Sequence, residues 1–334
     1  MANGDSKVIK VLSIDGGGIR GIIPAIILGE MQKRLGRDLS SIFDLIAGTS
    51  TGGIIAVGIG TACSNGKPYA PQKLLDLYVQ NGPQIFQKSF LTPVAQLFGP
   101  KYSAAPLEQI LAQFFGETDL ASALTPLLVS SYDLQSQLPF FFKSHKIAAR
   151  PEYNWKVREV ARSTSAAPTF FPPHFLASGN STFALVDGGV FVNNPSMAAY
   201  VEARTLYPDA SSILVVSVGT GDRNDSISYA QAKKWGLLGW ARQIAPVLMD
   251  SVSEAVDFEL GTLPQCTYYR LQIQNLQGSI AAMDNVSPEN LAALQTLANN
   301  YVASAPVSAK LDEICAQLKP GRGSTLSGTG RKLS

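Results

Sequence analysis

Two glycine-rich turns constrain the fold of this chain more than any other feature, because each lies between an extended apolar run and a helical segment. In the first, residues 8–14 are rich in β-branched side chains, residues 16–18 are three consecutive glycines, and residues 22–35 have helical character. Pro24 stands in the first helical turn, where proline is tolerated. This order predicts a strand, a tight loop and a helix.

The second turn repeats the same order. Residues 41–47 are predicted to form a strand, residues 48–53 a turn, and residues 54–59 a helix of small residues. Strands that alternate with helices predict an α/β fold in which helices cover both faces of the sheet. Further strands are expected at 127–132, 139–143, 182–186, 212–218 and 267–273.

The chain is predicted to form one domain. No internal repeat and no linker rich in Pro, Gly or Ser occurs before Leu318, so the domain is expected to span residues 8–318. Residues 319–334 are rich in Gly, Ser, Thr and basic residues and contain almost nothing apolar. They are predicted to be a disordered tail, with contact to anionic lipid as the alternative.

Composition argues against a nucleic-acid partner, a disulfide framework and a metal site. Lys and Arg total 27 against 25 for Asp and Glu, so no net field would collect a polyanion, and nucleic acid is not an expected partner. Cys63, Cys266 and Cys315 lie far apart without ligand spacing, so neither a disulfide framework nor a metal site is predicted.

The sequence also bears on location. Residues 1–10 carry charges and lack the apolar core of a secretion signal, so a cytoplasmic location is expected. No stretch reaches the roughly eighteen uninterrupted apolar residues that a membrane span needs. Any contact with a membrane is therefore expected to be peripheral.

The first glycine turn allows a dinucleotide-binding interpretation, because Gly16, Gly18 and Gly21 fit the G-x-G-x-x-G pattern. Such a site requires an acidic residue at the end of the next strand to hold the ribose. The predicted second strand contains Asp44 but ends in Gly48-Thr49-Ser50. The missing ribose ligand disfavours this interpretation, which is kept as an alternative.

The second turn, Gly48-Thr49-Ser50-Thr51-Gly52, fits the G-x-S-x-G nucleophile elbow, with a predicted strand before it and a helix after it. A sharp strand-to-helix turn lifts the serine hydroxyl clear of the sheet. Gly48 and Gly52 let the backbones cross without Cβ clashes. Ser50 is therefore the candidate nucleophile, and a structural turn serine is the alternative.

A serine nucleophile needs a base, and the chain contains only two histidines, His145 and His174. Both precede the best acidic candidate, and His174 follows two prolines in a stiff segment, so neither is the expected base. Asp187 ends a predicted strand and is followed by Gly188-Gly189, which leaves its approach open. A desolvated aspartate gains proton affinity and can act as base, whereas an Asp-Gly turn is the structural alternative.

Acyl transfer also needs donors for the oxyanion. Gly16, Gly17 and Gly18 offer unobstructed backbone amides at a helix N-terminus and are the candidate oxyanion hole. Arg20 would either attract an anionic head group or brace the loop through a salt bridge.

The motifs at 15–21, 48–52 and 187–189, in this order, resemble those of the patatin-like phospholipase family, and the likeness extends to Ser165-Ala166-Ala167-Pro168 and Asn193-Asn194-Pro195. The resemblance covers about residues 8–318. It implies a three-layer α/β/α fold with a mostly parallel sheet, a Ser/Asp pair that needs neither histidine, metal nor cofactor, and hydrolysis of fatty acyl esters of phospholipids, galactolipids or acylglycerols. A non-catalytic storage or interaction protein of the same fold is the alternative.

Two segments are candidates for contact with lipid. Residues 85–98 carry Phe86, Phe90 and Phe98, and residues 235–249 carry Trp235 and Trp240 among aliphatic side chains. Tryptophan beside a basic residue suits a membrane interface, and ordinary packing of helices in the core is the alternative for both segments.

Overall fold

A single sheet organises the protein in the computed structural model, which describes residues 7–63, 65–87, 99–222 and 227–319. Within these residues the sheet has eight strands in the order β5-β6-β3-β2-β1-β7-β8, and β4 also pairs with β3. Strands β3, β2, β1, β7 and β8 are parallel neighbours, whereas β4, β5 and β6 join through antiparallel pairs. The bounds are β1 (Val8–Ile14), β2 (Leu45–Thr49), β3 (Leu127–Asp133), β4 (Leu138–Lys143), β5 (His174–Ser178), β6 (Ser181–Asp187), β7 (Ser212–Val218) and β8 (Cys266–Leu271).

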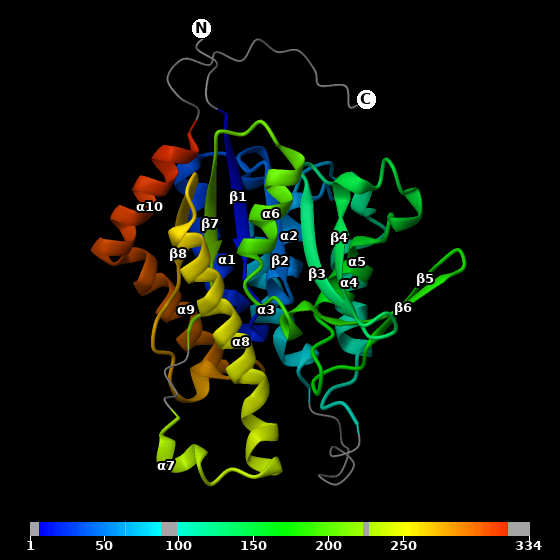
Figure 1. Cartoon of the computed structure of the whole chain (residues 1–334), viewed down its shortest axis with the longest axis vertical. Helices are drawn as coiled ribbons and strands as arrows, with labels where there is room; N and C mark the ends of the chain where they lie inside the picture. The colour runs from blue at the N-terminus through cyan, green and yellow to red at the C-terminus, as the bar shows by residue number, and fades with distance from the viewer. Residues whose placement is uncertain (1–6, 64, 88–98, 223–226, 320–334) are drawn as a thin grey trace, which may run out of the picture.

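Helices form the two outer layers (Figure 1). Helices α6 and α8 lie over one face of the sheet, and most of the remaining helices pack against the other. The predicted three-layer α/β/α fold with a mostly parallel sheet is thereby confirmed. The helices are α1 (Ile22–Leu35), α2 (Thr51–Gly60), α3 (Pro71–Ile85), α4 (Ala105–Phe115), α5 (Val157–Thr164), α6 (Ser196–Leu206), α7 (Tyr229–Ala232), α8 (Leu237–Thr262), α9 (Pro288–Ala303) and α10 (Ala305–Leu318).

Strand β1 shows why the sheet is covered on both faces. Leu12 and Ile14 belong to the larger apolar core, whereas Ile9 and Val11 belong to a smaller core on the opposite face. Because side chains alternate along a strand, a nearly continuous apolar run places apolar groups on both faces. Such a strand is stable only between two layers of helices.

Strand β3 joins the parallel and antiparallel parts of the sheet. One of its edges pairs with β4 along Leu128–Asp133. Its other edge pairs first with β2, where Ser130 faces Thr49, and then with β6, where Ser131 faces Asp187. Strands β2 and β6 therefore meet end to end, at their carboxyl ends, along one neighbouring strand.

Two strand predictions need correction. The strand expected at 41–47 begins only at Leu45, because Ile42 and Phe43 pack into the core from a turn that precedes it. Strand β5 was not predicted, since two prolines precede His174. It pairs antiparallel with β6 through a two-residue turn, in which Gly179 and Asn180 are exposed.

Some sequence predictions concern residues beyond this description. Residues 320–334 of the predicted tail and residues 88–98 of the first lipid-contact segment lie outside the described residues. No helix in the described ranges combines the length and the apolar character needed to cross a membrane.

Candidate active site

The turn between β2 and α2 holds Ser50 in a strained conformation. Its φ of 55° and ψ of −124° lie in a region that non-glycine residues rarely adopt. A Cβ atom on Gly48 would clash with the carbonyl of Gly52, and one on Gly52 would clash with the carbonyl of Ile14. The two glycines thus permit the tight crossing that lifts Ser50, whose side chain is partly exposed, above the sheet.

Asp187 lies beside this serine because β2 and β6 meet on β3. The Ser50 hydroxyl donates a hydrogen bond to the Asp187 carboxylate, which also accepts one from the Gly189 amide at 2.7 Å. Asp187 is only 4% exposed. Burial raises its pKa to about 7, although both hydrogen bonds act in the opposite direction. A carboxylate with this pKa can accept a proton near neutral pH.

The last residue of α5 and the segment that follows it support both members of this pair. The Ser50 amide donates to the Thr164 hydroxyl at 2.8 Å, and the Asp187 amide donates to the Ala166 carbonyl at 3.0 Å. Thr164 was not among the predicted site residues, and the only sequence signal near it is the Ser165–Pro168 segment noted above. Because the Ser50 amide is already bonded, it is not free to bind an oxyanion.

The first glycine loop lies against Ser50, but its amides are not equivalent. The Gly16 amide donates to the Asn193 carbonyl at 3.1 Å, and the Gly16 carbonyl accepts from the Thr220 hydroxyl at 2.6 Å. In the described part of the chain, the Gly17 and Gly18 amides have no such acceptor. Of the three predicted oxyanion donors, the Gly16 amide is therefore used to fix the loop, and the Gly17 and Gly18 amides remain candidates.

The same loop does not offer the open surface that a dinucleotide requires. A Cβ atom on Gly17 would clash with the Thr220 side chain, and one on Gly18 would clash with the Met283 carbonyl. The protein itself therefore fills the positions where a pyrophosphate would approach the glycines. This packing disfavours the dinucleotide-binding alternative.

Arg20 braces the glycine loop. It is 6% exposed and donates hydrogen bonds to the Gly221 carbonyl at 3.0 Å and to the Gly17 carbonyl at 3.4 Å. A buried guanidinium that is bonded to backbone carbonyls is not presented to a lipid head group. Of the two predicted roles, these contacts with backbone carbonyls favour bracing.

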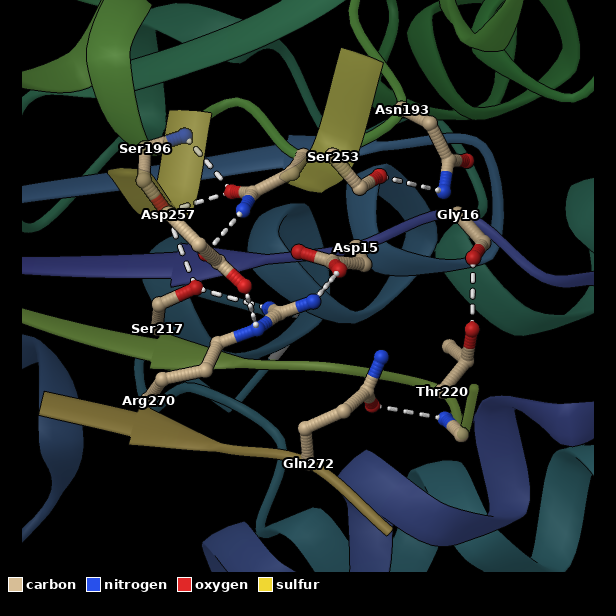
Figure 2. Close-up of polar contacts among 12 residues, drawn as sticks. Asp15, Gly16, Asn193, Ser196, Ser217, Thr220, Ser253, Asp257, Arg270 and Gln272 are labelled. Atoms are coloured by element: carbon tan, nitrogen blue, oxygen red, sulfur yellow. Dashed lines mark hydrogen bonds and ion pairs between the residues drawn. The ribbon is translucent and has the colours of Figure 1, made fainter. Parts of the chain in front are cut away.

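A buried ionic network lies behind the loop (Figure 2). Arg270 of β8 pairs with Asp15 at 2.6 Å and with Asp257 of α8 at 3.2 Å. Asp257 in turn accepts a hydrogen bond from Asn194 at 3.0 Å. Burial raises the pKa of Asp15 to about 6 despite the attraction of Arg270. The network connects the start of the glycine loop, the segment after Asp187 and helix α8.

The two histidines are engaged away from Ser50. His145 is hydrogen-bonded to Glu202 at 2.8 Å, and His174 is hydrogen-bonded to Ser163 at 2.9 Å. Burial, together with nearby Arg162, lowers the pKa of His174 to about 4. Among the residues that the structure describes, no group of three or more His, Cys, Asp or Glu side chains could hold a metal ion.

A partly exposed serine on a strained strand-to-helix turn, bonded to a buried carboxylate that can accept its proton, is characteristic of acyl hydrolases. Comparison with known sequences defines the family. Residues 12–200 match the family model "Patatin-like phospholipase", and the chain belongs to this family. The protein is accordingly a lipid acyl hydrolase.

Its relatives include plant proteins that match nearly the whole chain. Patatin-03 of Solanum tuberosum is 36% identical over 90% of this chain and 85% of its own length. Patatin-like protein 1 of Arabidopsis thaliana is 31% identical over 92% of this chain and 84% of its own length. Among solved structures, VipD from Legionella pneumophila aligns with a TM-score of 0.39 and 12% identity, over 93% of this chain and 67% of that one.

Proposed function

We propose that the protein hydrolyses fatty acyl esters of phospholipids, galactolipids or acylglycerols with Ser50 as nucleophile and Asp187 as its only base. The observation that carries this proposal is the hydrogen bond from the Ser50 hydroxyl to a buried carboxylate whose pKa is about 7. No histidine is needed, because burial gives the Asp187 carboxylate the proton affinity that a histidine imidazole provides in other serine hydrolases.

In the acylation step, Ser50 Oγ attacks the ester carbonyl carbon while its proton passes to Asp187. The amides of Gly17 and Gly18 stabilise the negative charge that develops on the carbonyl oxygen. The proton then moves from Asp187 to the leaving alcohol as the ester bond breaks. The products of this step are a lysolipid or other alcohol and an acyl-Ser50 ester.

A fluorophosphonate probe tests this assignment directly. We expect it to label the wild-type protein at Ser50 and to leave S50A unlabelled, with D187N labelled more slowly. The exposed Ser103 provides a matched control, because S103A keeps the pair intact. If folded wild-type protein stays unlabelled, or if S50A and D187A keep full esterase activity, the assignment is wrong. A storage or interaction protein would show no labelling at all.

We also propose that α8 contacts the lipid surface from which the substrate is taken. Trp240, Ile244 and Leu248 are spaced four residues apart on this helix, and their exposed fractions are 45%, 43% and 50%. Such spacing places them on one face. They do not pack in the core, so the core-packing alternative fails for them. The neighbouring α7 adds Tyr229, which is 81% exposed, beside the exposed Lys233.

Two features link this apolar stripe to lipid rather than to a second protein. Met249, the residue after Leu248, lies close to Gly189 beside the catalytic pair, so the helix that carries the stripe also borders the site. Figure 1 shows α7 and the start of α8 projecting beyond the body of the sheet, where aromatic and basic side chains could reach a lipid interface. A peripheral contact at this end would deliver substrate to the site.

A further inference from the structure

Asn193 combines two contacts around the catalytic pair. Its backbone carbonyl accepts a hydrogen bond from the Gly16 amide at 3.1 Å, whereas its side-chain amide contacts Ser253 of α8. The residue is only 8% exposed, and its Oδ1 has no hydrogen-bond partner in the described part of the chain. A buried acceptor without a partner costs free energy, so its retention beside a reactive serine needs an explanation.

The orientation of this side chain follows from its neighbour on α8. The Ser253 hydroxyl donates its one hydrogen to the Met249 carbonyl at 3.0 Å, so toward Asn193 it can only accept. The Asn193 Nδ2 lies 3.5 Å from that oxygen and is the donor (Figure 2). The Oδ1 is therefore the atom that faces the glycine loop, and it is an acceptor.

Distances place this oxygen close to both the nucleophile and the base. A Cβ atom built on Gly16 would lie 2.5 Å from Asn193 Oδ1 and 3.2 Å from Ser50 Cβ. A Cβ atom built on Gly189 would lie 3.2 Å from Asp187 Oδ1 and 3.6 Å from Asn193 Oδ1, with Met249 Cε at 3.5 Å. The open side of Gly189 is thus bounded by two oxygen acceptors and covered by one apolar group.

We propose that Asn193 binds the water that hydrolyses the acyl-enzyme, in a site that Gly189 keeps open between Asn193 Oδ1 and Asp187. A water molecule has two O–H groups, and the site offers two acceptors for them. One O–H is held by Asn193, while the other gives its proton to Asp187. This inference rests on the proposed role of Ser50 and Asp187 and assigns the second half of the same reaction.

The chemistry balances without any further group. The water oxygen forms a bond to the acyl carbonyl carbon as its proton passes to Asp187. The tetrahedral intermediate then collapses, the bond between that carbon and Ser50 Oγ breaks, and Ser50 regains the proton from Asp187. Free fatty acid leaves, and Asn193 has fixed only the direction from which the water attacks. Its loss should therefore slow deacylation and spare acylation.

Rapid-quench kinetics with p-nitrophenyl butyrate separate the two steps, because the burst of p-nitrophenol reports acylation and the steady rate reports deacylation. For N193A we expect a burst rate within about twofold of wild type and a kcat about tenfold lower, the worth of one good hydrogen bond. Intact mass spectrometry should show more acyl-enzyme. The exposed Asn299 supplies the control N299A, which should behave as wild type.

G189A is an independent second variant, because its methyl group would enter the water site while the Asn193 side chain keeps its amide group. The same pattern is expected from it. If the burst rate falls in parallel with kcat in both variants, Asn193 only supports the glycine loop and the inference is overturned. Unchanged kcat in both also overturns it. A wild-type enzyme that forms no acyl-enzyme, or an S50A variant that still forms one, would instead reject the underlying Ser50 assignment.

Discussion

At the scale of single residues, the carboxyl group of Asp187, the proposed base, links the expected activity of the protein to its stability. Its pKa of about 7 comes from burial, which the hydrogen bonds from Ser50 and Gly189 only partly oppose. Only the ionised form can take a proton from Ser50. The ionised Asp187 carboxylate therefore lowers the stability of the folded state at the pH at which we expect the enzyme to be active.

The first consequence is a pH profile. We expect kcat/KM to rise with pH through about 7 and then to level off, because protonated Asp187 cannot act as base. Asp15, whose pKa is about 6, would affect the profile only at lower pH. Initial rates on a soluble p-nitrophenyl ester between about pH 5 and 9 measure this. A profile that is flat across neutrality would contradict Asp187 as base.

The second consequence concerns stability. The folded pKa of Asp187 lies above the ordinary aspartate pKa of 3.8, so the folded state binds more protons between these two values and is destabilised as the pH rises toward about 7. D187N keeps the shape and removes the charge. We expect it to lose activity by at least about a hundredfold and to melt at a higher temperature than wild type at pH 8. The difference should shrink toward pH 5, and equal melting temperatures at pH 8 would refute it.

At the scale of elements, β8 and α8 are joined to the glycine loop by one buried arginine. R270M would leave the carboxylates of Asp15 and Asp257 without their cation, and we expect a loss of about 3–5 kcal/mol in the free energy of unfolding. R270K keeps the charge and should lose less. Urea titrations at pH 8 and pH 5 test this, with a smaller loss at pH 5 because Asp15 is then protonated. A fully stable R270M at pH 8 would show that the network contributes little.

Helix α8 also makes the proposed lipid contact testable apart from catalysis. We expect I244D combined with L248D to weaken binding to phosphatidylcholine vesicles at least tenfold, because each buried aliphatic side chain contributes about 1.5–3 kcal/mol. Hydrolysis of a soluble short-chain ester should be unchanged. V201D is a matched control, since Val201 is 56% exposed on α6. Vesicle sedimentation measures binding, and equal loss in V201D would contradict a specific surface.

At the scale of the whole molecule, the features that could be predicted are those that depend on residues close together in the sequence. The bounds of β1 and β7 follow from nearly continuous apolar runs, and both glycine turns follow from motifs a few residues long. The positions of Thr164, Asn193 and Arg270 around the site could not be read in this way. Arg270 meets Asp15 only because β1, β7 and β8 pair in a register that aligns Ser13, Ser217 and Arg270. Such alignment is a property of the assembled sheet.

The turn between β5 and β6 gives the molecule one further property. Gly179 and Asn180 are exposed, and they separate the part of the chain that carries Ser50 from the part that carries Asp187. A protein divided at this turn would have the proposed nucleophile on one fragment and the proposed base on the other, so we expect neither fragment alone to hydrolyse an ester. When the two fragments are mixed, the rate of ester hydrolysis that returns would then be proportional to the number of reassembled molecules. The enzyme thus offers a natural place for a split reporter whose signal is its own catalysis.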